Sequence, residues 1–250
     1  MTTPHRKLKK DGIVEVLVEI RFETNELSEL VLGKLLSAKL IDDNAIVSRL
    51  PAADLPEPIR KSDPNLKYQP HIEKRDKNNR ATLRVGSNVV SFHIYKYPGW
   101  DVYKQHISQL VEHLCTEVDS VTIKKLSLRY VDLLNPNDHK ITDINALTMD
   151  LSVNKESLEN INLSYLKSFD EQDETAHTVI TKIASPIFVQ GGRVPEKTAA
   201  IIDIDLFTPG NYSETNSDKI MRWYEAAHKT GNDIFFGLIP PEILQDITQD

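Results

Sequence analysis

The chain has 250 residues and a formal net charge of −7, with 40% hydrophobic and 27% charged residues. This composition is apolar enough to build a core, and it excludes a chain that is disordered throughout. A nucleic-acid partner is disfavoured, because binding a phosphate backbone requires a dense basic face, although a local basic patch stays open.

Membrane association is not expected from the hydropathy pattern. No apolar run approaches the roughly 20 residues that a membrane span requires. The basic start at 1–11 is not followed by a hydrophobic segment of signal-peptide length. The single cysteine, Cys115, has no second cysteine for an internal disulfide, which fits a reducing compartment. We therefore expect a cytoplasmic protein.

The first half of the chain predicts four strands and two helices around one irregular stretch. Alternation over 13–22 predicts a strand with Val16, Val18 and Ile20 on one face. A helix then carries apolar residues at helical spacing from 27 to 35. Five prolines among many charges predict a long irregular segment at 51–80.

A hairpin and a helix come next in the predicted order. The segments 81–85 and 88–95 read as two strands that turn at Gly86. A helix is expected from Asp101, with an apolar stripe running to Val118, and a strand over 121–134.

The second half is expected to add strands and a closing helix. The pattern predicts a helix around 155–160 and strands over 177–189 and 199–207. Ser217 can cap a final helix, with Gly231 placed beyond its end.

These elements predict an α+β fold with largely antiparallel sheets and helices packed on one face. Two related β-α-β-β-α-like halves remain an open alternative arrangement. The division is drawn at 1–135, with the long loop at 51–80, and 136–250; the halves pack intimately, and a single domain is the alternative.

Several landmarks along the chain resemble those of one protein family, in the same order. They are Val14-Glu-Val-Leu-Val-Glu-Ile-Arg-Phe22, Tyr97-Pro-Gly-Trp100, Leu128-Arg-Tyr-Val131, Ile202-Asp-Ile-Asp205, and His228 with Phe235. The family is a sporadically distributed, uncharacterised bacterial one. The resemblance implies a bacterial, cytosolic protein and carries over no catalytic residue. Its patchy distribution suggests a toxin–antitoxin or phage-defence setting.

Strong catalytic motifs are absent from the sequence. There is no phosphate-binding P-loop, no G-x-G-x-x-G and no C-x-x-C, so no cofactor is expected. The strand over 13–22 does place Glu19 and Arg21 on one face, where Arg129 from another strand could join them around an anionic ligand. The favoured alternative is a solvated face with cross-strand ion pairs.

Two further constellations could carry chemistry. Asp203 and Asp205 share one face of a strand and could hold Mg²⁺ through carboxylate oxygens, although the wet face of any half-buried strand looks the same. Ser91, His93 and Tyr95 share one face of a predicted strand, and the histidine could act as a base. No partnered nucleophile is identifiable from the sequence, so a structural histidine is favoured.

The turn Tyr97-Pro-Gly-Trp100 carries two aromatic residues. Exposed, Tyr97 and Trp100 would anchor a partner, because such side chains concentrate binding energy. Burial, with Trp100 packed at the entry of the next helix, is the favoured alternative.

The leading functional prediction is a non-catalytic binding protein with a protein partner or a second copy of itself, such as an antitoxin or defence subunit. The alternative is a metal-dependent phosphoryl or nucleotide hydrolase, with Asp203 and Asp205 on the metal and Arg21 and Arg129 on phosphate. An RNA-binding sheet face ranks last, because the net charge is negative.

Overall fold

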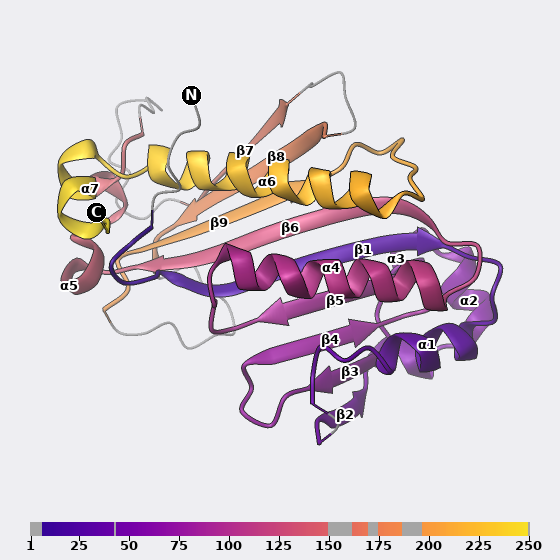
Figure 1. Cartoon of the computed structure of the whole chain (residues 1–250). Helices are drawn as coiled ribbons and strands as arrows, with labels where there is room; N and C mark the ends of the chain where they lie inside the picture. The colour runs from indigo at the N-terminus through magenta and orange to yellow at the C-terminus, as the bar shows by residue number, and fades with distance from the viewer. Residues whose placement is uncertain (1–6, 43, 150–161, 170–174, 187–196, 250) are drawn as a thin grey trace.

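A nine-stranded sheet forms the centre of the molecule (Figure 1). The computed structural model describes residues 7–42, 44–149, 162–169, 175–186 and 197–249. All strand pairs are antiparallel, in the order β2-β3-β4-β5-β1-β6-β9-β8-β7. The strands are β1 (Ile13–Glu23), β2 (Ile46–Arg49), β3 (Ile72–Arg75), β4 (Ala81–Val85), β5 (Val89–Ile94), β6 (Thr122–Leu134), β7 (Asn162–Phe169), β8 (His177–Ala184) and β9 (Ala200–Phe207). The predicted α+β class is confirmed.

Strand β1 divides the two faces of the sheet as its alternation predicts. Val16, Val18 and Ile20 are fully buried, whereas Glu15 and Glu19 point to the opposite face. Burying each such apolar side chain stabilises the fold by about 1.5–3 kcal/mol. The same register continues through β6, β5 and β9, so one face is apolar and the other carries the charges.

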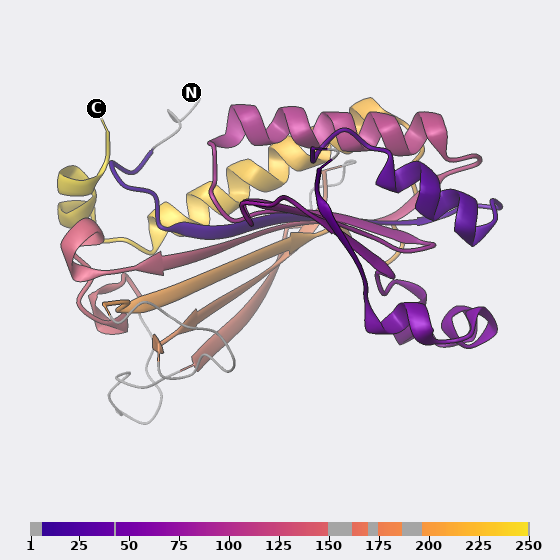
Figure 2. The same ribbon diagram turned by 90° about the horizontal axis from the view of Figure 1, so that it is seen from below.

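Three helices cover the apolar face: α1 (Ser28–Leu36), α4 (Trp100–Glu117) and α6 (Ser217–Gly237) (Figure 2). Helix α4 buries a stripe at helical spacing that includes Tyr103, Ile107 and Leu114. Helices α4 and α6 lie side by side over β1, β6 and β9. The expectation of helices on one face is confirmed for these long elements.

The strand order relates the two halves of the chain. Strands β1 and β6 lie side by side at the centre; the strands that follow each of them extend outward on its own side, and a long helix closes each half. This arrangement divides the chain before β6, and the relation between two halves stays a prediction. Strand β6 pairs with both β1 and β9, and the division at residue 135 stays a prediction.

The expectation of an irregular segment at 51–80 was wrong. This segment holds a 3-10 helix η1 (Pro51–Asp54), α2 (Glu57–Ser62), α3 (Pro64–Lys67) and β3. Pro51, Pro58 and Pro64 all occupy the first or second position of a short helix. A proline is tolerated there because the amide of that turn has no intrahelical partner, so these prolines begin helices instead of preventing them.

Helix α6 runs further than the sequence suggests. Gly231 lies inside it and packs on the sheet, since a Cβ at that position would lie 3.2 Å from Leu206 Cδ1 and 3.6 Å from Tyr130 Cε2. The glycine therefore serves close packing rather than helix termination. The helix expected at 155–160 lies outside the described residues, as does the end of the strand predicted over 177–189.

The chain ends meet at one end of the sheet, where short elements α5 (Pro136–His139), η2 (Ile144–Ala146) and α7 (Pro241–Ile247) gather (Figure 1). Residues Lys7–Lys9 run beside the end of α7: Lys9 N donates to Ile247 O at 2.7 Å, and Gln249 N donates to Lys7 O at 2.8 Å. Within the described parts of the chain, none of the helices combines the length and apolar character that crossing a membrane requires.

Candidate ligand-binding pocket

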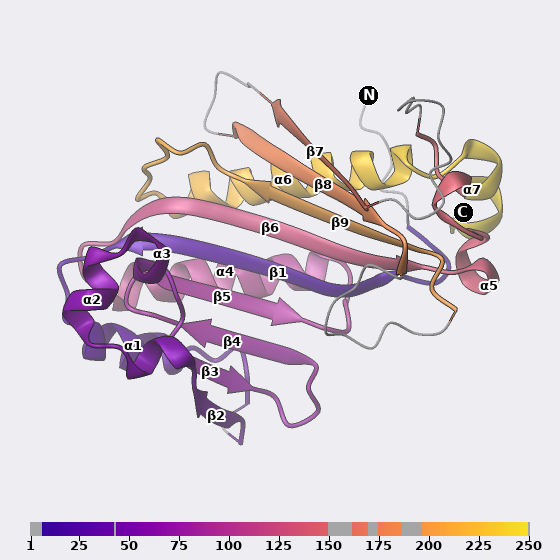
Figure 3. The same cartoon turned by 180° about the vertical axis from the view of Figure 1, so that it is seen from behind.

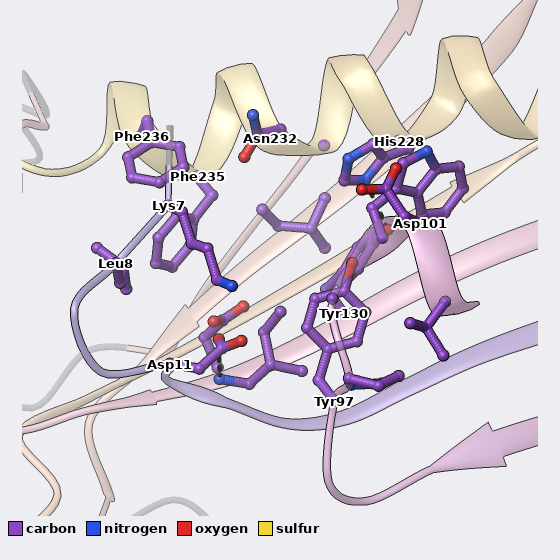
Figure 4. A pocket seen from close by; sticks show the side chains of 18 residues that line it. Lys7, Leu8, Asp11, Tyr97, Asp101, Tyr130, His228, Asn232, Phe235 and Phe236 are labelled. Atoms are coloured by element: carbon purple, nitrogen blue, oxygen red, sulfur yellow. Dashed lines mark hydrogen bonds between the residues drawn. The ribbon is translucent and has the colours of Figure 1, made fainter. Parts of the chain in front are cut away.

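A cavity of about 340 Å³ lies between α4, α6, the apolar face of the sheet and the N-terminal segment (Figure 4). The Tyr97–Trp100 turn forms one side, β6 the floor, and the C-terminal half of α6 another side. Its volume is in the range of small-molecule sites. Aromatic and carboxyl side chains make up much of the pocket wall.

The Tyr97–Trp100 turn builds an aromatic wall. Gly99 adopts φ +94°, a backbone conformation that residues other than glycine rarely adopt. This conformation turns the chain directly into α4. Trp100 then stacks on His228 of α6 with ring centroids 3.9 Å apart and planes 9° from parallel. Its indole Nε1 donates to Glu225 Oε2 at 3.0 Å, which fixes the ring. The wall is thus set before any ligand arrives.

Two tyrosines continue this wall to the floor. The Tyr130 hydroxyl lies 2.9 Å from His228 Nδ1, and the Tyr97 ring meets the Tyr130 ring edge-on at 6.2 Å. Burial raises the pKa of Tyr97 and of Tyr130, so both hydroxyls stay protonated at neutral pH. Phe235 of α6 faces them across the pocket (Figure 4).

The floor carries a buried carboxyl. The side chain of Asp132 on β6 belongs to a residue that is only 3% exposed, and among the described residues it has no hydrogen-bond or ion-pair partner. Burial, with the nearby Asp11 adding to it, raises the pKa of Asp132 well above its ordinary value. A buried carboxylate without a partner is costly, so burial favours the neutral acid.

Asp11 lies beside Asp132 at the mouth of the pocket. Its pKa is raised by desolvation, against which the amide of Ile13 and the charge of Lys7 act. Ile13 N donates to Asp11 Oδ1 at 3.1 Å. Figure 4 shows the ammonium of Lys7 reaching across the pocket toward Asp11. The chain therefore already directs one of its own cations at the carboxyl pair.

The structure brings two of the predicted residues into this site. Tyr97 and Trp100 both line the pocket and are partly buried, so they combine the packing and the binding alternatives of the sequence analysis. Asp132 was missed. Its signal was present, because it occupies a core-facing position in the alternation Leu128, Tyr130, Asp132, Leu134, where an acid is out of place.

The remaining predicted residues belong to the central strands and lie on the opposite face of the sheet, where α2 and α3 pack at one end (Figure 3). Arg21 Nε donates to Glu19 at 2.7 Å. Arg129 binds Asp203 through two bonds of 2.7 and 2.8 Å, and Ser127 donates to Asp205 at 2.7 Å. The Arg129–Asp203 pair joins β6 to β9 and is a cross-strand ion pair, as the structural alternative describes.

The carboxylates of this face are already engaged. Asp203 is held by the Arg129 guanidinium, and burial raises the pKa of Asp205. In the part of the chain that the structure describes, no group of three or more His, Cys, Asp or Glu side chains could hold a metal ion. The metal role of Asp203 and Asp205 stays a prediction, and their present partners count against it.

Comparisons with known proteins add no name to this geometry: no protein-family model and no curated protein matches the chain. The family resemblance of the sequence therefore stays a prediction. Some of its landmark residues nevertheless gather in space, because Tyr97, Trp100, Tyr130, His228 and Phe235 all line this pocket.

Proposed function

We propose that the protein is a binding protein whose ligand enters the pocket beside Tyr97 and Trp100, and that this ligand is an organic cation with a flat apolar body. The observation that carries the proposal is the Asp132 carboxyl, which is buried at the pocket floor without a partner among the described residues. A buried charge requires an opposite charge, and a cationic ligand would supply it.

The aromatic wall supports the same ligand class. Faces of tyrosine and tryptophan attract cations within about 6 Å of the ring. Tyr97, Trp100 and Tyr130 surround the space above the carboxyls, while Phe235 offers apolar surface. The Lys7 ammonium directed at Asp11 supports a cationic group at this position. A lysine or arginine side chain of a partner protein would present the same chemistry, which keeps the predicted partner role within this proposal.

The functional setting is not part of this proposal. The antitoxin and phage-defence roles that the resemblance suggests have no support from the fold or the pocket. A metal-dependent hydrolase at Asp203 and Asp205 is not adopted either, since Arg129 and Ser127 occupy these carboxyls.

Isothermal titration of the full chain with benzylamine, benzyl alcohol and benzoate tests the proposal. All three share the ring and differ in charge. We expect benzylamine to bind and the neutral and anionic analogues to bind at least tenfold more weakly. Asp132→Asn should abolish this preference. Asp233→Asn removes an exposed acid from α6, the helix that lines one side of the pocket. It is the matched control and should leave the preference for benzylamine intact. Equal binding of all three compounds would reject the cation assignment.

A further inference from the structure

Three polar side chains on the face of the sheet opposite α4 and α6 form a continuous hydrogen-bonded chain. Ser91 Oγ lies 3.1 Å from His93 Nε2, and His93 Nδ1 lies 2.8 Å from Glu15 Oε1. Ser91 and His93 are two residues apart on β5 and so share one face, and Glu15 comes from the neighbouring β1. The sequence pattern reveals the serine and the histidine but not the acid that joins them across 78 positions.

The order of atoms fixes the role of each group. When Glu15 is ionised, His93 donates its Nδ1–H to the carboxylate, and Nε2 is left to accept the Ser91 hydroxyl proton. The hydrogen bond with His93, followed by the charges of Arg129 and Arg84, keeps the pKa of Glu15 below its ordinary value despite partial burial. Hydrogen bonds therefore link a hydroxyl nucleophile to a base and that base to an orienting acid.

Ser91 lies between two ion-paired arginines, one on each neighbouring strand. In the strand register, Arg84 of β4 lies directly opposite Ser91 on one side and Glu19 of β1 on the other. Glu19 holds Arg21, and Arg84 is bound through Nε to Glu73 at 2.8 Å. Ser91 and His93 are each 6% exposed, so the reacting atoms are largely shielded from water. A guanidinium beside a nucleophile can stabilise an oxyanion and attract an anionic substrate.

We propose that Ser91, His93 and Glu15 form a hydrolytic site for small carboxylic esters that carry an anionic group. Ser91 is the nucleophile, His93 the general base and acid, and Glu15 the positioning residue. Arg84 stabilises the carbonyl oxygen as it becomes negative, and Arg21 binds the anionic group of the substrate.

The reaction consumes one water and needs no further reactant. Ser91 Oγ attacks the ester carbonyl carbon and forms a carbon–oxygen bond while its proton passes to His93 Nε2. The bond from that carbon to the alcohol oxygen breaks, and the alcohol leaves with the proton from Nε2. Water then attacks the acylated serine and gives a proton to Nε2. The carboxylic acid leaves as Ser91 Oγ recovers that proton.

This inference stands apart from the cation pocket, which lies on the other face of the sheet and shares none of these residues. Loss of either proposal leaves the other in place.

The test uses the purified full chain, a fluorophosphonate probe and two esters, 4-nitrophenyl hydrogen succinate and neutral 4-nitrophenyl acetate. We expect the probe to phosphonylate Ser91, as mapped by mass spectrometry, and the anionic ester to be hydrolysed faster than the neutral one. Ser91→Ala should lower hydrolysis at least tenfold. Ser127→Ala removes a serine from the same face of the sheet, on β6. It is the matched control and should leave the rate of hydrolysis unchanged.

Two variants separate catalysis from a structural role. Arg84→Gln should lower the rate for the anionic ester more than for the neutral one. Glu15→Gln should lower kcat for both esters and leave KM unchanged, because His93 loses the carboxylate that orients its imidazole. Hydrolysis by a folded Ser91→Ala variant at the rate of the unaltered chain, or labelling of any other residue, would overturn the proposal.

Discussion

Asp132 illustrates how one residue can set the character of a site. It interrupts the apolar phase of β6 between Tyr130 and Leu134, and it is buried without a hydrogen-bond partner among the described residues. The folded state therefore favours the protonated form, and the pKa of Asp132 is raised. The stability contributed by such a group is complete below the unfolded pKa near 3.9 and is lost as the pH rises through the folded pKa.

This linkage gives a stability prediction for Asp132→Asn. The amide has the shape of the acid but cannot ionise, so the variant should raise the free energy of unfolding at pH 8 by about 1–3 kcal/mol. The gain in stability should vanish toward pH 4, where the acid of the unaltered protein becomes neutral like the amide of the variant. Urea unfolding of both proteins from pH 4 to pH 8 measures it; a gain that is independent of pH would contradict the assignment.

Lys7 gives a second prediction at the residue scale. Its ammonium is directed at the carboxyls that a cationic ligand would use, so it should compete with that ligand. Lys7→Ala should tighten benzylamine binding several-fold in a calorimetric titration. Lys10→Ala removes a charge from the same segment, but one paired with Asp138 at 2.9 Å, and serves as the control. Equal effects of both variants would point to net charge instead of competition.

At the scale of elements, two helical glycines offer a paired test. Gly33 in α1 has nothing within 4 Å of an added Cβ, whereas Gly231 in α6 meets Leu206 and Tyr130. Gly33→Ala should stabilise the protein by up to about 1 kcal/mol, the helix-propensity difference. Gly231→Ala should gain less or lose stability, because Leu206 or Tyr130 must move. Thermal melts compare them, and an equal gain would show that α6 is loosely packed on the sheet.

Periodic elements were predictable and their meeting points were not. The alternation of β1 and the apolar stripe of α4 each repeat over several turns or strand periods, so local sequence defines them. The segment 51–80 was misread because a proline marks a helix start as readily as a break. The pocket combines Asp11, Trp100, Asp132 and His228 from four distant segments, and only the sheet order brings them together.

Some site residues were accessible to sequence reasoning for the same local reason. Tyr97 and Trp100 flank a Pro-Gly turn, which marks them as unusual without any knowledge of their neighbours. The link between Glu15 and His93 has no local signature, because it depends on the pairing of β1 with β5.

At the scale of the whole molecule, the β1–β6 pair at the centre of the sheet joins the part of the chain from β1 to α4 with the part from β6 to α6. Separating the halves would break that pair and uncover the apolar residues beneath α4 and α6. We therefore expect one cooperative unfolding transition, with coincident midpoints by far-ultraviolet circular dichroism and tryptophan fluorescence. Two separated transitions would indicate halves that are stable on their own.

The cation pocket is the central claim, and proton release on binding tests it most directly. A cation that enters beside Asp132 should restore its ionised form, because burial raises the pKa of this carboxyl well above its ordinary value. Benzylamine titrations from pH 5 to pH 8, in buffers of different ionisation enthalpy, should show proton release that largely disappears in Asp132→Asn. Binding without proton release at any pH, and with equal affinity in the variant, would contradict the account.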